Sequence, residues 1–355
     1  HCAWGFATGM TRKTCIIGAG SSGIAACRAL QECGIPFVCY EAGSDIGGLW
    51  AFRNSNGRSS AYRSLHINTS RRQMAYDDFP LPEDSPDFPH HELIARYFND
   101  YAAHFGLDKH IRFDSEVVRA ERVDDGRWRL TLTDGSSEEF DALIVANGHH
   151  WDPKWPDPPL PGEFSGTVMH SHDYIDPGEP ADLRDKTVVV LGMGNSAMDI
   201  ATELGHKGNA ARVFLSARSG VHVMPKYFGD KVLDFIVRYP LDRPRWYEYP
   251  LHLLPYRARR RVIGLIMGHL IRRTVGRPEA VGLPKPKHRF DQAHPTISAE
   301  IHNSLGSGDV LVKPGIKRLE GEQIRFTDGS VETVDALICA TGYKISFPFF
   351  DDALL

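Results

Sequence analysis

The sequence lacks the features that mark several common classes of protein. Its 355 residues include six cysteines but no CxxC pair, which argues against a thiol–disulfide reductase and a cysteine-ligated zinc site. The 17 histidines form no HExxH motif, so the sequence predicts no metal site. The longest apolar stretch, residues 262–271, is about half of the roughly 20 residues that a membrane-spanning helix needs.

The sequence also lacks a large excess of charge of either sign. The 41 lysines and arginines nearly balance the 45 aspartates and glutamates, and the net charge is −4. This balance predicts no nucleic-acid partner, because such partners are held largely by excess positive charge. Residues 1–10 show no basic segment followed by an apolar one, so they are interpreted as an upstream extension and not as a signal peptide. Cysteines in mostly apolar contexts, interpreted as reduced, indicate a cytoplasmic protein.

Glycine is abundant, and a first cluster lies near the start of the chain. An apolar, strand-like segment at residues 13–17 runs into a GxGxxG turn at 18–23, a helix-like segment at 24–30 and a second strand at 36–40 that ends on Glu41. This order is typical of a dinucleotide-binding unit, whose backbone N–H groups and helix dipole hold the pyrophosphate. A carboxylate after the second strand accepts ribose hydroxyls and repels a 2′-phosphate, which predicts FAD or NAD. The candidate binding residues are Gly18, Gly20, Ser21, Ser22, Gly23 and Glu41.

The same pattern occurs a second time. A strand-like segment at 186–191 is followed by a GxGxxA turn at 192–197, a helix-like segment at 198–204 and a strand at 212–216. This strand ends near Arg218 instead of an acid, and a guanidinium there can pair with a 2′-phosphate, which predicts NADP. The alternative is an ordinary solvated arginine. The turn contributes Gly192, Gly194, Asn195 and Ala197 as candidate binding residues.

An internal repeat supports two similar units. Residues 130–148 and 324–342 align without gaps and are identical at 11 of 19 positions. Each copy predicts a hairpin with an Asp-Gly turn, followed by a buried strand. The strands lead to Gly148 and Gly342, which we expect beside the bound nucleotides.

These observations predict an α/β protein with two Rossmann-like dinucleotide-binding domains, related in architecture to glutathione reductase. The FAD-binding domain is expected to comprise residues 11–155 and 335–355, and the NADP-binding domain, inserted into it, residues 156–334. Hydride would then pass from NADPH to a flavin. A basic insertion at about 226–277, with 12 Lys and Arg against 4 Asp and Glu, is interpreted as a helical subdomain. Contact of this insertion with an anionic membrane surface is the less favoured alternative.

Several motifs then identify the chain as similar to the flavin-containing monooxygenases. Residues 164–174 fit that family's FxGxxxHxxx[FY] pattern, and residues 66–80 resemble its NTSK-type segment before DFP. Residues 47–50 resemble its GGxW stretch and residues 340–343 its ATGY strand. The motifs occur in the family's order over about residues 12–350.

The resemblance implies a specific chemistry. Such enzymes are reduced by NADPH, react with O2 to form a C4a-hydroperoxyflavin, and transfer one oxygen to the nitrogen or sulfur of a small amine or sulfide. The family's active-site asparagine falls on Asn68, although without the family Asn68 would be interpreted as an Asx-turn residue. The resemblance also implies FAD contacts at Gly48, Leu49, Trp50 and Thr69, and NADP contacts at Ser196, Ala197, Met198 and Asp199.

Alternatives remain open at this point. A Baeyer–Villiger monooxygenase would have the same fold, although its motif ends in Trp where this chain has Tyr174. Family members usually continue for on the order of 100 residues beyond the ATGY strand, so the C-terminal part of the FAD domain is expected to be missing. A chain of this length that only binds nucleotides and oxidises NADPH without oxygenation is therefore a further alternative. A homodimer is left open by the sequence.

Overall fold

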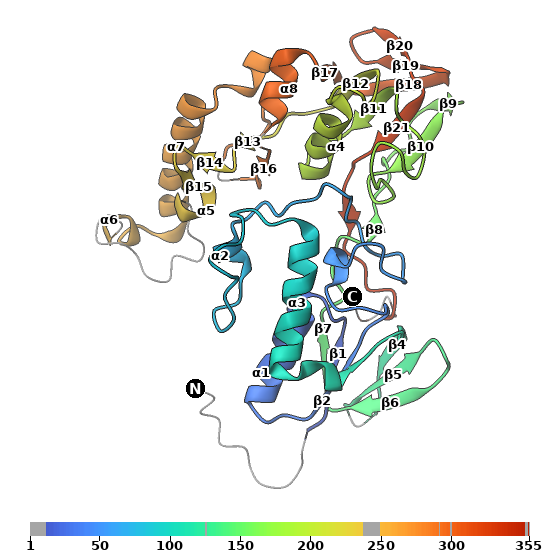
Figure 1. Cartoon of the computed structure of the whole chain (residues 1–355), viewed down its shortest axis with the longest axis vertical. Helices are drawn as coiled ribbons and strands as arrows, with labels where there is room; N and C mark the ends of the chain where they lie inside the picture. Colours follow the sequence, from blue (N-terminus) through green and yellow to red (C-terminus); the bar gives the residue numbers. More distant parts are fainter. Residues whose placement is uncertain are drawn as a thin grey trace. The chain divides into compact units, whose positions relative to one another are not determined.

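The chain folds into two compact units (Figure 1). The computed structural model describes residues 12–124, 126–236, 249–290, 292–298, 300–351 and 354, so the predicted extension at 1–10 lies outside the described residues. The first unit combines His1–His66, Pro89–Pro153 and Tyr343–Leu355, and the second combines Ile67–Phe88 and Lys154–Gly342.

A parallel sheet forms the centre of the first unit. Its strand order is β3 (Ile111–Arg112), β2 (Phe37–Tyr40), β1 (Thr14–Ile17) and β7 (Ala142–Val145). Every residue of β1 is buried, as expected for a parallel strand covered on both faces. The unit also contains α1 (Ser21–Glu32), η1 (Gly48–Trp50), α3 (His91–Phe105), η2 (Leu107–His110), the antiparallel sheet β4 (Val117–Arg122), β5 (Trp128–Leu132) and β6 (Ser137–Phe140), and the pair β8 (Asp152–Pro153) and β22 (Tyr343–Lys344).

The second unit is built around a parallel sheet of five strands. Their order is β10 (Thr167–His170), β21 (Ala336–Cys339), β11 (Thr187–Leu191), β12 (Arg212–Ala217) and β17 (Leu311–Pro314). Its helices are α2 (Arg71–Met74), α4 (Asn195–Gly205), α5 (Leu233–Ile236), α6 (Tyr249–His252), α7 (Tyr256–Thr274), η4 (Pro278–Val281) and α8 (Ile301–Ser307). Smaller sheets comprise β20 (Val331–Thr333), β19 (Gln323–Phe326), β18 (Ile316–Gly321) and β9 (Gly162–Phe164), the pair β13 (Val223–Met224) and β16 (Thr296–Ile297), and the hairpin β14 (Tyr227–Phe228) and β15 (Lys231–Val232).

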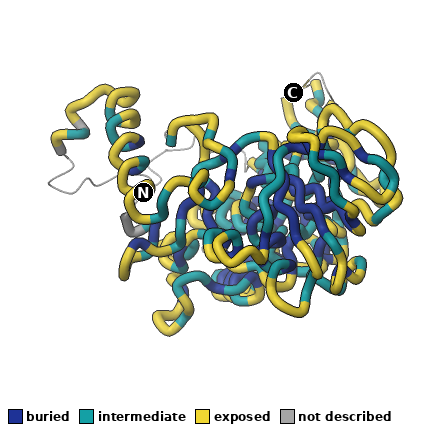
Figure 2. The backbone as a smooth tube through the Cα atoms, turned by 90° about the horizontal axis from the view of Figure 1, so that it is seen from above, coloured by how far each residue is buried: buried dark blue, intermediate teal, exposed yellow. Residues whose placement is uncertain are grey.

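The internal sequence repeat is also a structural repeat. Its first copy forms β5, β6 and β7, and its second copy forms β19, β20 and β21. In each unit the last of these strands pairs in parallel with the strand that precedes the glycine turn, so β7 lies beside β1 and β21 beside β11. Strands β1, β11 and β21 are almost completely buried, whereas β7 is half-buried. Figure 2 draws buried residues in dark blue.

The boundaries of the two compact units differ from those of the two predicted domains. The second unit includes β21, because this strand pairs with β10 and β11, whereas residues 335–355 were all predicted in the FAD-binding domain. It also includes Ile67–Phe88, which falls inside the predicted 11–155 segment. Pairing of distant strands sets these boundaries, and a linear sequence pattern does not show it.

The basic insertion at 226–277 begins with the β14–β15 hairpin and continues in helices, with residues 237–248 outside the described part of the chain. Helix α7 buries Met267 and Ile271 in a cluster with Met224 and Phe228. The helix therefore packs on its own unit along this face. Of the described helices, none is long and apolar enough to cross a membrane.

Candidate functional site

A cavity of about 470 Å³ opens in the first unit. It lies where β1, β2 and β7 end, which is where parallel α/β sheets bind their ligands. Its lining includes nine of the residues predicted to bind a cofactor: Gly18, Gly20, Ser21, Ser22, Glu41, Gly48, Leu49, Trp50 and Gly148. The structure therefore brings together residues that lie up to 130 positions apart (148 − 18) in the sequence.

The glycines of the first turn are required by close backbone contacts. Gly18 has φ +99°, and a Cβ placed on it would lie 2.5 Å from the carbonyl oxygen of Ala146. A Cβ on Gly23 would lie 1.8 Å from the carbonyl oxygen of Gly18. Both distances are far below van der Waals contact, so neither position accepts a larger residue without backbone movement.

The start of helix α1 suits an anionic ligand. Gly20 is the N-cap of α1, no side chain caps the helix, and the first turn contains no acidic residue. Gly48, with φ +58°, approaches so closely that its Cβ would lie 3.2 Å from the Cα of Gly20. Neither Gly20 nor Gly48 carries a side chain that could cover the start of α1. The backbone N–H groups and the positive end of the helix dipole are therefore open to a pyrophosphate. The residues present fit a dinucleotide.

Glu41 is held rigidly at the edge of this cavity. Its carboxylate is buried and accepts hydrogen bonds from the backbone N–H groups of Ala19 at 2.7 Å and Gly43 at 2.8 Å. Burial raises the pKa of Glu41, and these two bonds and the charge of Arg58 oppose that rise. The fixed carboxylate retains oxygen lone pairs that can accept ribose hydroxyls.

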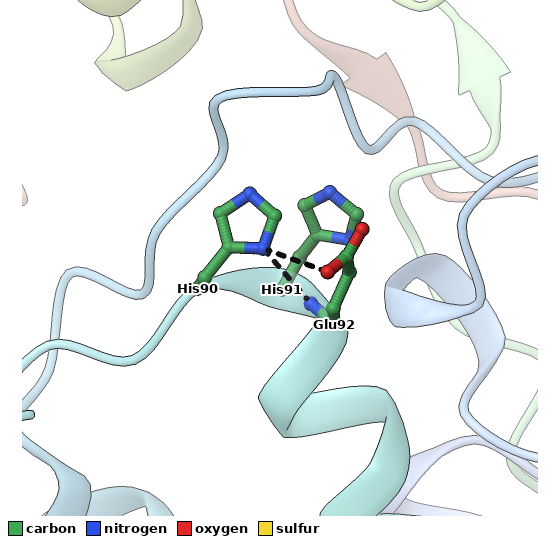
Figure 3. A group of neighbouring side chains, drawn as sticks. All are labelled: His90, His91 and Glu92. Carbon is green, nitrogen blue, oxygen red and sulfur yellow. Dashed lines mark hydrogen bonds and ion pairs between the residues drawn. The ribbon is translucent and has the colours of Figure 1, made fainter. Parts of the chain in front are cut away.

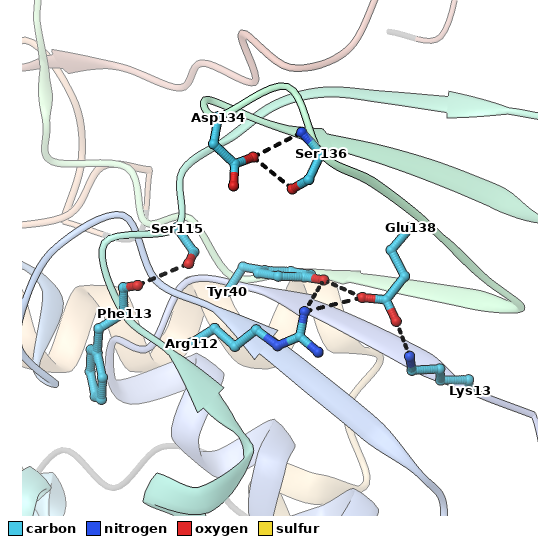
Figure 4. Close-up of polar contacts among 8 residues, drawn as sticks. All are labelled: Lys13, Tyr40, Arg112, Phe113, Ser115, Asp134, Ser136 and Glu138. Carbon is cyan, nitrogen blue, oxygen red and sulfur yellow. Dashed lines mark hydrogen bonds and ion pairs between the residues drawn. The ribbon is translucent and has the colours of Figure 1, made fainter.

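A polar network lies behind the neighbouring Tyr40 (Figure 4). The Tyr40 hydroxyl donates to Glu138 on β6 at 2.7 Å, and Arg112 approaches both groups at 3.2 Å. Lys13 also pairs with Glu138. Burial opposes ionisation of Glu138, but the bonds from Lys13 and Tyr40 and the charges of Lys13 and Arg112 outweigh it and lower the pKa of this carboxyl.

We expect Glu138→Gln to lower the free energy of unfolding by about 1 kcal/mol at pH 7, since it removes the charged acceptor of three donors at a partly exposed site. The folded-state pKa of Glu138 is below the ordinary 4.5, so its stabilisation is present above that pH and is lost as pH falls through the lowered pKa. Urea unfolding at pH 7 and pH 3 measures this. The exposed Glu163→Gln serves as the control, and an equal effect of Glu138→Gln at both pH values would contradict the expectation.

The cavity also contains residues that sequence reasoning missed. The Arg58 guanidinium lies 4.7 Å from the centre of the Trp151 ring and pairs with Glu116, and all three residues line the cavity together with Asn56 and Phe347. They come from loops outside the glycine motifs. No local spacing links them, so only the fold could reveal this cationic and aromatic wall.

In the second unit, the turn between β11 and α4 repeats the geometry of the first. Gly192 has φ +149°, and its Cβ would lie 2.2 Å from the carbonyl oxygen of Ala340. Gly194 is the N-cap of α4, which again has no side-chain cap and no acidic residue in its first turn. Ala197 takes the place of the third glycine and is fully buried.

Some of the predicted NADP-binding residues of α4 have buried side chains that a nucleotide could not contact. Ala197 and Met198 are 0% exposed, and the Asn195 side-chain oxygen accepts the N–H of Ile297 at 2.9 Å. A nucleotide would therefore meet Ala197 and Met198 through the backbone. Ser196 and Asp199 are half-buried. The 3.6-residue period of the helix explains this division, and the motif alone does not resolve it.

Arg218 and Gly342 lie where the sequence places them. Arg218 directly follows β12 and is exposed, and a Cβ on Gly315 would lie 2.8 Å from its Cγ, so Gly315 leaves room for the arginine stem. Gly342 is exposed with φ +88°, and no atom lies within 4 Å of a Cβ built there.

Asn68 and Thr69 belong to the second unit and are not among the residues that line the cavity of the first. Asn68 is half-buried and Thr69 is exposed, between the buried Ile67 and Ser70. Two side chains of the basic insertion contact this short stretch, Lys226 at Ile67 and Asp234 at Ser70.

The FxGxxxHxxx[FY] segment is structural in its described contacts. His170 is 0% exposed, and its Nδ1 accepts the backbone N–H of His172 at 3.1 Å. Burial lowers the pKa of His170, which favours the neutral ring. The buried Tyr174 hydroxyl donates to Glu203 at 2.8 Å. These contacts indicate an architectural role for the motif.

Among the described residues, the structure brings together one group of possible metal ligands that the sequence analysis did not identify. The ligand atoms of His90, His91 and Glu92 all lie within 4.8 Å of one another at the start of α3 (Figure 3). His90 already uses both ring nitrogens, because Nδ1 accepts the N–H of Glu92 at 3.4 Å and Nε2 lies 2.7 Å from the carbonyl oxygen of Arg63. The positive end of the helix dipole also disfavours a cation here. We therefore interpret His90 as the N-cap of α3.

Comparison with known proteins gives consistent matches. A family model described as "Flavin-binding monooxygenase-like" matches residues 11–355. Flavin-containing monooxygenase 5 of Oryctolagus cuniculus is 36% identical over 97% of this chain and 64% of its own length. Dimethylaniline monooxygenase [N-oxide-forming] 2 of Pan troglodytes is 34% identical over 98% of this chain and 64% of its own. The chain thus spans about 64% of the length of these curated relatives.

Solved structures agree in fold. S-allyl-L-cysteine S-oxygenase from Allium sativum matches with a TM-score of 0.65 and 25% identity, over 97% of this chain and 65% of that one. A protein named OTEMO, solved in complex with FAD and NADP, matches with a TM-score of 0.68 and 21% identity, over 94% of this chain and 71% of that one. The predicted fold class, with two Rossmann-type dinucleotide-binding units, is confirmed.

Proposed function

Because the chain belongs to the flavin-binding monooxygenase-like family, we propose that it binds FAD in its first unit and NADP in its second, and uses NADPH and O2 to oxygenate the nitrogen or sulfur of small organic molecules. The resemblance predicted from the sequence is confirmed by this membership. The oxygenase activity of this chain and its FAD and NADP cofactors belong to the proposal. The cytoplasmic location stays a prediction.

The observation that carries the proposal is the glycine-lined cavity of the first unit. It combines an uncapped helix start, two closely spaced glycine backbones and a buried carboxylate, each suited to one part of FAD. We assign the pyrophosphate to Gly18, Gly20 and the first turn of α1, and the ribose to Glu41. When bound, the flavin supplies the activation of O2, while the chain orients it and restricts water.

The second unit is proposed to hold NADPH at the start of α4. The backbone of Gly192 and Gly194 would hold the pyrophosphate, and Arg218 would pair with the 2′-phosphate. NADPH held by these residues would supply the reducing equivalents. This assignment explains why the acid at the corresponding position of the first unit is replaced by an exposed arginine.

Asn68 is proposed as the active-site amide. An amide both donates and accepts hydrogen bonds and carries no acidic proton, so it can orient flavin and nicotinamide without promoting loss of hydrogen peroxide. The names of two similar proteins, an N-oxide-forming monooxygenase and an S-oxygenase, support nitrogen and sulfur as target atoms.

Turnover with simple substrates tests the proposal. The flavin-loaded protein is incubated with NADPH, O2 and either trimethylamine or methyl phenyl sulfide, and NADPH consumption, oxygenated product and H2O2 are measured together. We expect substrate to stimulate NADPH oxidation and to yield N-oxide or sulfoxide. NADPH oxidation that yields only H2O2, or no response to either substrate, would contradict the proposed oxygenase activity.

Asn68→Ala is expected to lower the yield of product per NADPH at least about tenfold, since a hydrogen bond to a reacting cofactor is removed. Flavin content should remain near that of the unsubstituted protein, because the cavity lining does not include Asn68. The matched control is Asn303→Ala, an exposed asparagine on α8. Equal product yields in the two variants would rule out an active-site role for Asn68.

A further inference from the structure

The segment Ile67–Phe88, which carries Asn68, is held at both ends by one short part of the insertion. That part is the β14–β15 hairpin with the residues on either side of it, from Lys226 to Asp234. Both belong to the second unit. The contacts between them are side chain to backbone at one end and side chain to side chain at the other.

At the first end, two charged side chains flank the Asn68–Thr69 pair. The Lys226 ammonium donates to the carbonyl oxygen of Ile67 at 3.1 Å. The Asp234 carboxylate accepts the backbone N–H of Ser70. The residue before Asn68 and the residue after Thr69 are therefore each bound through the backbone by a charge-bearing group, and such hydrogen bonds are stronger than neutral ones.

At the other end of the segment, Tyr227 of the insertion contacts Asp87 and Phe88. The Tyr227 hydroxyl donates to the Asp87 carboxylate at 2.9 Å, and its ring meets Phe88 edge to face at 5.3 Å. The Lys226 ammonium also lies 5.0 Å from the centre of the Phe88 ring. Lys226 and Tyr227 thus contact the start and the end of a segment whose ends lie 21 positions apart (88 − 67) in the sequence.

The surroundings of Lys226 suit a fixed cation. Burial of the ammonium lowers its pKa, while the charges of Asp199 and Glu300 act in the opposite direction. Its stem is half-buried, which restricts the side chain to few conformations. Asp199, whose charge acts on this lysine, lies on α4 and is also one of the predicted NADP contacts.

We propose that Lys226 is a positioning residue that sets the backbone of Asn68 through the carbonyl group of Ile67, with Asp234 holding the adjacent Ser70. The role given to Asn68 rests on the proposed function. The backbone contacts themselves do not. In the unsubstituted protein the amide would then be presented in one orientation, and loss of the lysine would leave it in several.

Hydrogen exchange tests the positioning directly and needs no activity. In Lys226→Met, which keeps the length of the side chain but not its charge, the amide of Ser70, which donates to Asp234, should exchange about tenfold faster than in the unsubstituted protein. Amides of α3 should not change, and Lys226→Arg should largely restore protection because it retains a charged donor. Lys231→Met, an exposed lysine on β15, is the matched control. Unchanged exchange at Ser70 in Lys226→Met would overturn the proposal.

A second variant covers the case in which Lys226→Met fails to fold. Tyr227→Phe removes only the bond to the Asp87 side chain at an exposed ring. It should speed exchange by a few fold at Arg71, whose N–H donates to the carbonyl oxygen of Asp87 at 2.7 Å, and leave Ser70 protected. If Tyr227→Phe instead deprotects Ser70 while leaving Arg71 unchanged, the division of contacts described above is wrong.

Turnover then separates this inference from the proposed function. With an active unsubstituted enzyme, Lys226→Met should lower kcat about tenfold, raise H2O2 per NADPH, and leave the KM for NADPH within about threefold. Faster exchange at Ser70 in a protein that never oxygenates would support the positioning and refute the proposed function. An active enzyme whose kcat and H2O2 yield are unchanged in Lys226→Met would refute the positioning role alone.

Discussion

Gly23→Ala is expected to destabilise the first unit by about 3 kcal/mol or more and to abolish retention of flavin. The added Cβ would lie 1.8 Å from the carbonyl oxygen of Gly18, which belongs to the same tight turn and has φ +99°. Backbone has to move to relieve that overlap, and overpacking against backbone is costly. The displaced turn would no longer present its N–H groups to a pyrophosphate.

Thermal unfolding and the flavin content of purified protein measure this effect. Gly306→Ala is the matched control, because a Cβ on Gly306 meets no atom within 4 Å and the residue lies inside α8. Alanine should leave stability unchanged there or raise it by up to about 1 kcal/mol. A Gly23→Ala protein with the melting temperature and flavin content of the unsubstituted protein would show that the close packing of α1 on the turn is not needed.

Arg218→Ala is expected to raise the KM for NADPH about 100-fold while changing that for NADH less than about threefold. The guanidinium directly follows β12 and is exposed, so it is available to a 2′-phosphate, and only NADPH carries that group. Charge-assisted pairing of arginine with phosphate contributes roughly 1.5–3 kcal/mol, which corresponds to this range of affinity.

Steady-state kinetics with both nucleotides test the assignment. Arg212→Ala is the matched control, since Arg212 is an exposed arginine at the other end of the same strand and pairs with Glu332 at 3.2 Å. It should affect neither nucleotide selectively. Equal losses for NADPH and NADH in Arg218→Ala would mean that the arginine does not bind the 2′-phosphate.

Local sequence patterns predicted most of the elements that form the site. The strands before and after each glycine turn lie within a few residues of their expected positions, and both repeats form a hairpin followed by a parallel strand. The turns and hairpins depend on contacts between near neighbours in the chain, whereas the parallel pairing of β7 with β1 and of β21 with β11 joins distant residues. The tight turns impose positive φ angles on Gly18 and Gly192, which favour glycine. The glycines therefore make these turns recognisable in the sequence.

Other parts of the site arise from contacts between distant residues. Arg58, Glu116 and Trp151 meet at the cavity although they belong to three separate loops. The contacts of Lys226 and Asp234 with the Asn68 stretch join segments more than 150 positions apart (226 − 67 and 234 − 70). No periodicity or spacing records such pairs, because their separation along the chain carries no structural information.

The sequence by itself determined the two glycine turns and their order, and it predicted opposite ribose preferences for them, because short-range geometry requires particular residues at particular spacings. Only the tertiary structure decided which side chains of α4 are buried, which unit contains β21, and which side chain contacts the carbonyl group before Asn68. Those outcomes depend on how complete elements pack and pair, and packing is a property of the whole fold rather than of any short motif.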